Sequence, residues 1–249
     1  MINKTILIGC GGTGSYLAPP LARLLKAFKF AGELILADGD SYEPSNLDRQ
    51  SFNLDLLGEN KAIAQAKRLQ CEIEDFQCSV IDDYLSEEDV NEYVTDGTLV
   101  INCADNNAIR KFVEDRVDTL DNAVHICCGN ELRHGQVQIS CKEGGKRTTR
   151  SIYEYAPIFK EGSGDRSKMS CQELAELEGG GQLITANFFA AALALGYVAN
   201  IIRNDYTTHK LYNDTVVFDS ISNNTKSTPR DWTVPEEPMA QPALEASSV

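Results

Sequence analysis

The sequence predicts an α/β fold with a mostly parallel sheet flanked by helices and an antiparallel extension in its C-terminal half. Strand-like runs alternate with helix-like periodicity through the first half, and a glycine-rich turn follows the first strand. In the second half, residues 135–141 alternate strictly between apolar and polar side chains. A chain of 249 residues with 42% hydrophobic content suffices for one sizeable core.

The first half justifies the parallel part of the sheet element by element. Apolar residues recur at helical spacing between short apolar runs, and Ser86 is placed to cap a helix whose first turn is acidic. Because each strand is followed by a helix, parallel β-α-β units with right-handed crossovers are expected. The expected strands are 5–10, 33–38, 76–81, 98–103 and 123–128, and the expected helices are 17–28, 63–73, 86–94 and 106–120.

The second half has a different pattern. Val137, Ile139 and Cys141 fall on one face of a half-exposed, antiparallel strand, and residues 147–153 are expected to pair with it. Residues 159–168 are rich in glycine, serine and charge, which predicts a mobile loop. The run at 183–202 predicts a long buried helix, because its most apolar part is shorter than the roughly 20 residues of a membrane span. A final hairpin is expected to turn at Asn213–Asp214.

These patterns predict one domain over residues 1–232, with a nucleotide-binding half at about 1–130 and a partner-binding half at about 131–232. The proline-rich segment 233–249 predicts a disordered tail. The net charge of −14 argues against nucleic acid and anionic membranes as partners. The N-terminus lacks the pattern of a signal peptide. Eight cysteines without a C-x-x-C pair indicate a reducing cytoplasm and no structural zinc.

The glycine-rich turn predicts a Rossmann-like nucleotide site. Gly9, Gly11, Gly12 and Gly14 lie between a strand and a helix, where backbone N–H groups meet a phosphate. Asp38 ends the second strand, where a carboxylate accepts hydrogen bonds from a ribose. NAD, FAD, SAM and ATP share that ribose, and a tight turn without a ligand is the simpler alternative.

The segment after Asp38 favours a triphosphate. Arg49 and Lys61 flank a turn-rich stretch that also carries Asn46, and two cations with an amide suit a leaving group that gains charge. Asp105 follows another strand, where a carboxylate can hold Mg²⁺. Each residue taken alone has a simpler explanation: a solvated surface charge for Arg49 and Lys61, and a helix N-cap for Asp105.

Four segments, "GCGGTG", "LADGDSYEPSNLDRQ", "GENKAIAQAKRL" and "CADNNAIR", resemble the ThiF/MoeB/ubiquitin-activating enzyme superfamily, in its bacterial or mobile-element type. The resemblance covers roughly Ile6 to Arg110 well and Cys171 to Ile202 in outline. Its specific part is S-N-L-x-R-Q followed by G-x-x-K. A ThiF-like protein of this kind would form a homodimer.

The resemblance implies ATP- and Mg²⁺-dependent adenylation of a carboxylate, usually the C-terminus of a ubiquitin-like β-grasp protein or a peptide. That carboxylate would attack the α-phosphate, and pyrophosphate would leave. Arg49, Lys61 and Asp105 would be catalytic, with Asp105 as the metal ligand. The residues expected to bind ATP are Gly9, Gly11, Gly12, Thr13, Gly14, Asp38, Asp40, Asn46, Arg49, Gln50, Lys61, Asp105 and Asn106.

Cys171 is the candidate for a further, thioester-forming step. It follows the expected mobile loop and precedes the long helix, as the reactive cysteine does in similar proteins. Arg166 and Lys168 nearby would favour its thiolate. The alternative is an incidental loop thiol. Among the other candidates, Cys127 and Cys128 are expected to pack, and His125 is expected to be a core histidine.

Two further interpretations stay open. Gly9 to Asp38 would suffice for an NAD-binding oxidoreductase, which leaves Arg49, Lys61 and Asp105 unexplained. A catalytically silent, nucleotide-bound interaction module is the third reading. The chain also departs from the superfamily in one respect, because only Met1–Lys4 precede the first strand, where many relatives have a helix with an arginine that reaches a partner's ATP.

Overall fold

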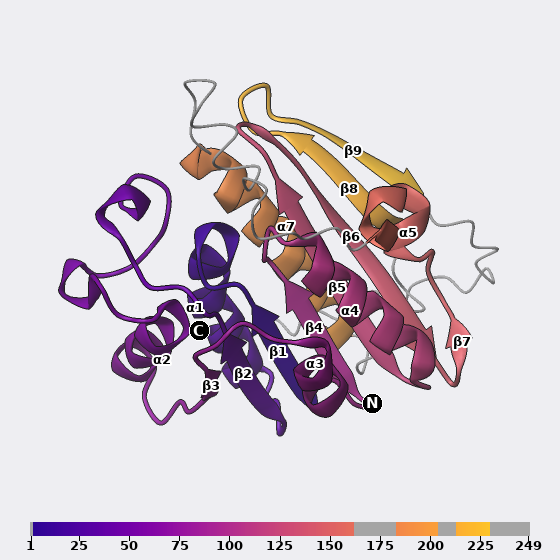
Figure 1. Cartoon of the computed structure of the whole chain (residues 1–249), viewed down its shortest axis with the longest axis horizontal. Helices are drawn as coiled ribbons and strands as arrows, with labels where there is room; N and C mark the ends of the chain where they lie inside the picture. The colour runs from indigo at the N-terminus through magenta and orange to yellow at the C-terminus, as the bar shows by residue number, and fades with distance from the viewer. Residues whose placement is uncertain (1, 162–182, 204–212, 230–249) are drawn as a thin grey trace, which may run out of the picture.

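The computed structural model describes residues 2–161, 183–203 and 213–229, and across them a single sheet of nine strands runs through the chain (Figure 1). Eight strands follow the order β3-β2-β1-β4-β5-β6-β8-β9, and the short β7 pairs with β6. The first five are parallel and the last are antiparallel, which confirms the predicted sheet. The strands are β1 Lys4–Ile8, β2 Glu33–Ala37, β3 Ser79–Ile81, β4 Thr98–Asn102, β5 Ala123–Asn130, β6 His134–Glu143, β7 Lys146–Arg147, β8 Asn213–Asp219 and β9 Asn224–Pro229.

The order of the parallel strands determines where a ligand can bind. The chain steps outward from β1 to β2 and β3, then crosses back to β4 on the other side of β1. The strand order therefore reverses between β1 and β4. In open α/β sheets, ligands bind beyond the carboxyl ends of the strands at such a switch point.

Helices cover both faces of the sheet, with α4 in front and α7 behind in Figure 1. One core joins the apolar sides of α1, α2 and α7 to the sheet, and a second core joins α3 and α4 to the opposite face. Alternate residues of β1 divide between the two cores, as expected for a strand buried on both faces. The helices are α1 Gly12–Ala27, α2 Lys61–Glu72, α3 Glu87–Tyr93, α4 Asn107–Thr119, α5 Ile152–Tyr155 and α7 Ile184–Arg203, with 3₁₀ turns η1 Pro44–Asn46, η2 Leu54–Leu56 and η3 Pro157–Glu161.

Helix α7 has the length and position of the long helix expected at 183–202. Its 20 residues and their hydropathy are sufficient for a membrane span by length and composition alone. However, nine of its residues are buried within the protein, and the helix packs against α1, β5 and β6. This is the arrangement of a core helix, as the sequence predicted.

Two expectations about the β6 region were wrong. The strand is antiparallel, and Val137, Ile139 and Cys141 do enter the core, but it is not half-exposed because Gln138 and Ser140 on its other face are also buried. Of the expected partner strand at 147–153, only Arg147 pairs with β6, as part of the two-residue β7. Beyond it the chain turns into α5, because the side chain of Ser151 caps that short helix.

The expected turn at Asn213–Asp214 was also wrong. Asn213 begins β8, and Asp214 is buried where the side chain of Arg150 donates to it at 3.1 Å. Asn-Asp is typical of turns, but this ion pair keeps the dipeptide in a strand. The hairpin turns instead at residues 220–223, between β8 and β9.

The remaining differences are small. Strand β3 is shorter than expected, and Phe159 to Glu161 belong to η3 rather than to a loop. Ser86 caps α3 as predicted, since its side chain accepts from the backbone N–H of Asp89. The rest of the expected loop and the tail at 233–249 lie outside the described residues, and the single-domain boundaries stay a prediction.

Candidate functional site

The glycine loop connects β1 to α1 at the switch point. Gly9 has φ +85°, and a Cβ on it would lie 2.8 Å from the backbone nitrogen of Ala104. A Cβ on Gly14 would lie 1.8 Å from the carbonyl oxygen of Gly9. The glycine loop therefore lies closer to the turn after β4 than a side chain on Gly9 would allow. The start of α1 lies closer to the loop than a side chain on Gly14 would allow. Because the first turn of α1 has no acidic residue, its positive end suits a phosphate.

Asp38 ties this loop to the end of β2. Its Oδ2 accepts from the backbone N–H of Cys10 at 2.6 Å, and its Oδ1 accepts from that of Asp40 at 2.8 Å. Burial raises the pKa of Asp38, and the Lys61 ammonium and the two N–H groups partly offset that effect. A carboxylate has about four acceptor positions, so Asp38 keeps capacity for a ribose hydroxyl.

Tyr42 supports the same loop from the other side, and the sequence analysis missed it. Its ring is buried against Phe52, with the ring centroids 4.0 Å apart. Its hydroxyl donates to the carbonyl oxygen of Cys10 at 2.8 Å and accepts from Gln65 at 2.7 Å. The segment after Asp38 is thereby held against the glycine loop.

The S-N-L-x-R-Q segment forms a compact turn over the glycine loop. Asn46, Arg49 and Gln50 are all buried, although they are polar. The backbone N–H of Gln50 donates to the carbonyl of Asn46 at 2.9 Å, and the Gln50 amide lies 3.4 Å from where a Gly11 Cβ would be. Arg49 thus adds a buried cation to the turn beside the glycine loop, and a guanidinium suits a phosphate.

Lys61 begins α2 and reaches back to the end of β2. Only 10% of its side chain is exposed, and its Nζ lies 3.2 Å from Oδ2 of Asp40, whose own side chain is 51% exposed. Asn60 caps the helix through its side-chain oxygen and donates to the carbonyl of Asp38 at 2.7 Å. A buried ammonium is thus fixed beside Asp38 by the local fold.

Asp105 lies in the turn between β4 and α4, and its side chain is exposed. The N-cap of α4 is Asn106, whose side-chain oxygen accepts from the backbone N–H of Ala108 at 2.7 Å. The alternative that Asp105 caps this helix is therefore wrong. The turn that carries Asp105 lies against Gly9, so it borders the glycine loop.

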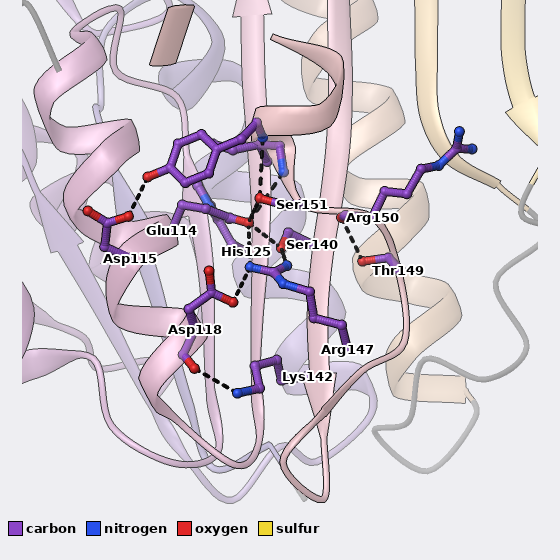
Figure 2. A network of polar contacts seen from close by, with 12 residues as sticks. Glu114, Asp115, Asp118, His125, Ser140, Lys142, Arg147, Thr149, Arg150 and Ser151 are labelled. Atoms are coloured by element: carbon purple, nitrogen blue, oxygen red, sulfur yellow. Dashed lines mark hydrogen bonds and ion pairs between the residues drawn. The ribbon is translucent and has the colours of Figure 1, made fainter. Parts of the chain in front are cut away.

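A second buried polar cluster lies on the opposite face of the sheet from α7 (Figure 2). We call it the Glu114 cluster: Glu114, His125, Ser140, Arg147 and Ser151. Oε1 of Glu114 accepts from Ser140 at 2.8 Å, Ser151 at 2.7 Å and Arg147 at 3.0 Å, and Oε2 lies 3.0 Å from Nδ1 of His125. His125 is fully buried, as predicted for a core histidine.

Among the described cysteines, Cys71 is exposed and the others are buried or half-buried. Cys127 and Cys128 are buried, which confirms that they pack. Burial raises the pKa of Cys10 well above its ordinary value, which favours the unreactive thiol. Cys171, Arg166 and Lys168 lie outside the described residues.

Comparison with known proteins identifies the fold's relatives. The model of the ThiF family matches residues 3–236, which is nearly the whole chain. The chain belongs to the ThiF family. It is 34% identical over 113 residues to the adenylyltransferase and sulfurtransferase MOCS3 of Danio rerio, covering 45% of this chain and 24% of that protein. It is 31% identical over 110 residues to the sulfur carrier protein ThiS adenylyltransferase of Escherichia coli K12, covering 44% of this chain and 42% of that protein.

Solved structures share the fold over most of the chain. PaaA superposes with a TM-score of 0.66 at 20% identity, covering 92% of this chain and 64% of its own. E. coli MccB crystallised with ATP superposes with a TM-score of 0.65 at 21% identity, with the same coverage. This ThiF-family chain thus spans less than half of the curated relatives and just under two thirds of these structures. At such identity the structures establish the fold alone.

Proposed function

We propose that this protein is an ATP-dependent adenylyltransferase that transfers AMP to a carboxylate. One observation carries the proposal: two buried cations, Arg49 and Lys61, lie at the same sheet edge as a glycine loop locked by Asp38. A nicotinamide cofactor needs the loop and the carboxylate but gives no reason for the cations. Both curated relatives are named adenylyltransferases, which agrees.

The reaction needs positioning and charge more than proton transfer. An oxygen of the substrate carboxylate bonds to the α-phosphorus, the bond from that phosphorus to the bridging oxygen breaks, and pyrophosphate leaves with the electron pair. The carboxylate is already ionised, so a general base has no role. Arg49 and Lys61 offset the charge that develops on the phosphates, and such preorganised groups are each worth about 3–4 kcal/mol.

Asp105 is the residue that would hold Mg²⁺, which would offset the negative charge of the phosphates when ATP binds. Mg²⁺ is usually held by one or two carboxylates, with water and substrate phosphates completing its shell. A single exposed carboxylate beside the glycine loop fits that mode.

The carboxylate that we propose is the C-terminus of a ubiquitin-like β-grasp protein or of a peptide. The name of one relative refers to the sulfur carrier protein ThiS, and MccB has been crystallised with MccA. We further propose that the protein acts as a homodimer. The net charge of −14 disfavours an RNA-borne carboxylate.

The test is ATP–pyrophosphate exchange with candidate partners, each compared with the same partner carrying an amidated C-terminus. We expect exchange with the free carboxylate and none with the amide, because only the carboxylate can attack phosphorus. Failure of exchange with every partner, together with tight NAD binding, would contradict the proposal.

Thioester transfer to Cys171 is a separate proposal with its own test. The Cys171 thiolate would attack the acyl carbon of the adenylate and AMP would leave, which predicts a covalent partner adduct. Hydroxylamine should release this adduct by attack on the thioester carbonyl, and Cys171→Ala should abolish it while pyrophosphate exchange continues. Cys71, an exposed thiol on α2, provides the matched control because Cys71→Ala should leave the adduct unchanged. An adduct that persists in Cys171→Ala removes Cys171 from the mechanism.

A further inference from the structure

Asn187, in the first turns of α7, is fully buried against the glycine loop. Its amide nitrogen donates to the carbonyl oxygen of Arg49 at 3.0 Å. Its Oδ1 accepts from the side chain of Asn130 at 2.7 Å and from the hydroxyl of Thr13 at 3.4 Å. One side chain thus joins the start of α1, the phosphate-side turn and the end of β5.

The packing at Gly12 shows how closely this side chain fits. A Cβ on Gly12 would lie 2.7 Å from Oδ1 of Asn187 and 3.1 Å from its Cγ. Since Asn187 is held by hydrogen bonds from two sides, it cannot move aside without losing them. Part of the reason for glycine at position 12 is therefore Asn187, and not only the approach of a nucleotide.

The start of α7 is also anchored to the β5–β6 hairpin. The backbone N–H of Leu183 donates to the carbonyl of Leu132 at 2.9 Å, and Asn130 lies at the end of β5 beside that turn. Elements that are far apart in sequence are thereby fixed relative to the glycine loop. Rigid support of this kind determines how accurately a binding site is shaped.

We infer that Asn187 is a positioning residue of the nucleotide site: it holds the glycine loop and the Arg49 turn in register for ATP. The inference rests on the proposed function for the identity of the ligand. An amide suits this place because it donates to a carbonyl and accepts from two donors at once. Aspartate has the same shape but cannot donate when ionised, and alanine can do neither.

The experiment measures ATP affinity by calorimetry, ATP–pyrophosphate exchange and thermal unfolding for Asn187→Ala, Asn187→Asp and a control. Thr185→Val is the matched control, because Thr185 lies in the same turn of α7 but bonds to Ser220 at 3.0 Å instead. We expect the two Asn187 variants to bind ATP about tenfold to 100-fold more weakly, the range for misplaced binding groups. The KM for the carboxylate should stay unchanged, and Thr185→Val should resemble the wild type.

Asn187→Asp separates hydrogen bonding from packing, because it preserves the volume of the side chain. It should be at least as defective as alanine, since it loses the donation to Arg49 and adds a negative charge near the phosphates. If both variants unfold at lower temperature yet bind ATP as the wild type does below their transition, Asn187 is only structural and the inference fails.

A double-mutant cycle with Gly12→Ala adds a readout that uses ATP affinity alone and needs no carboxylate substrate. In the wild-type background the new methyl group collides with the Asn187 amide, whereas Asn187→Ala removes the atoms that it would meet first. Gly12→Ala should therefore weaken ATP binding less in the second background, and equal losses would overturn the inference. Because ATP binding is measured directly, a protein that binds ATP but exchanges no pyrophosphate would refute the proposed function and leave this inference standing.

Discussion

The proposed nucleotide site and the Glu114 cluster both bury charged side chains, but their charged groups face different partners. In the Glu114 cluster, both oxygens of the Glu114 carboxylate on α4 are bound to side chains within the protein, and these partners come from β5, β6, β7 and the N-cap of α5. At the nucleotide site, buried Lys61 pairs with an Asp40 side chain that is half-exposed, and Asp105 is exposed.

This difference shows that burial of charge does not by itself mark a functional site. Glu114 joins helix to sheet and turns its charge inward, so it leaves nothing for a ligand. In the proposed nucleotide site, the glycine loop and the cations lie beyond the carboxyl ends of β1, β2 and β4, where the strand order reverses. Substitutions in the two places should therefore separate a cluster that stabilises the fold from one that binds a ligand.

The largest effect is expected on stability when Glu114 is removed. Glu114→Ala should lower the free energy of unfolding by about 3–5 kcal/mol, because it leaves Arg147 and His125 without their buried partner. Denaturant unfolding measures this loss. Asp118→Ala removes an exposed partner of the same Arg147 and should cost at most about 1 kcal/mol. Equal losses in the two variants would mean that buried Glu114 contributes no more to stability than an exposed partner of Arg147.

Replacing the buried cations Arg49 and Lys61 should affect activity rather than stability. Arg49→Ala and Lys61→Ala should each lower pyrophosphate exchange by at least about 100-fold, because each removes charge stabilisation from the phosphates. Lys67→Ala is the matched control, since Lys67 lies on the same helix with an exposed side chain. Exchange that survives in Arg49→Ala would show that the buried guanidinium serves the fold alone.

The Glu114–His125 pair predicts a pH dependence of stability. Burial opposes the charge of Glu114, but its interactions with His125 and Arg147 outweigh that effect and lower its pKa to about 2. Burial also opposes the charge of His125, but the neighbouring Cys127 and Glu114 outweigh that effect and raise its pKa to about 9. The lowered carboxyl pKa contributes stability above pH 4.5 that is lost as pH falls towards 2. The raised imidazole pKa contributes stability below pH 6.5 that is lost as pH rises towards 9.

The unfolding free energy should therefore be largest between pH 4.5 and pH 6.5 and fall by about 2–3 kcal/mol towards pH 9. Denaturant midpoints across the pH range measure this, with His125→Gln as the comparison. A wild-type profile that matches that of His125→Gln would contradict the assignment of the pair.

The smallest effect is expected at Tyr42, which supports the nucleotide site without facing a ligand. Tyr42→Phe removes the hydroxyl between Cys10 and Gln65 and should cost about 1–2 kcal/mol of stability. ATP affinity should fall only severalfold, since the ring still packs on Phe52. A loss of ATP binding as large as that of Arg49→Ala would place Tyr42 in the site itself.

The sequence predicted the parallel half and the loop residues because their signals are local. Glycine spacing, the Asp38 position and the S-N-L-x-R-Q turn lie within one continuous stretch, and the structure brings them to one edge. The turn expected at Asn213–Asp214 failed because a long-range ion pair with Arg150 overrides local composition. Asn187 and the Glu114 cluster were missed for a related reason, because their partners lie far away in sequence.

The most direct test of the central claim compares the binding of ATP with Mg²⁺, of AMP and of NAD by calorimetry, in the wild type and in Arg49→Ala. A site for a consumed triphosphate predicts that ATP binds more tightly than AMP or NAD, and that Arg49→Ala removes most of the difference between ATP and AMP. If NAD binds at least as tightly as ATP and Arg49→Ala changes neither, the account of this sheet edge is contradicted.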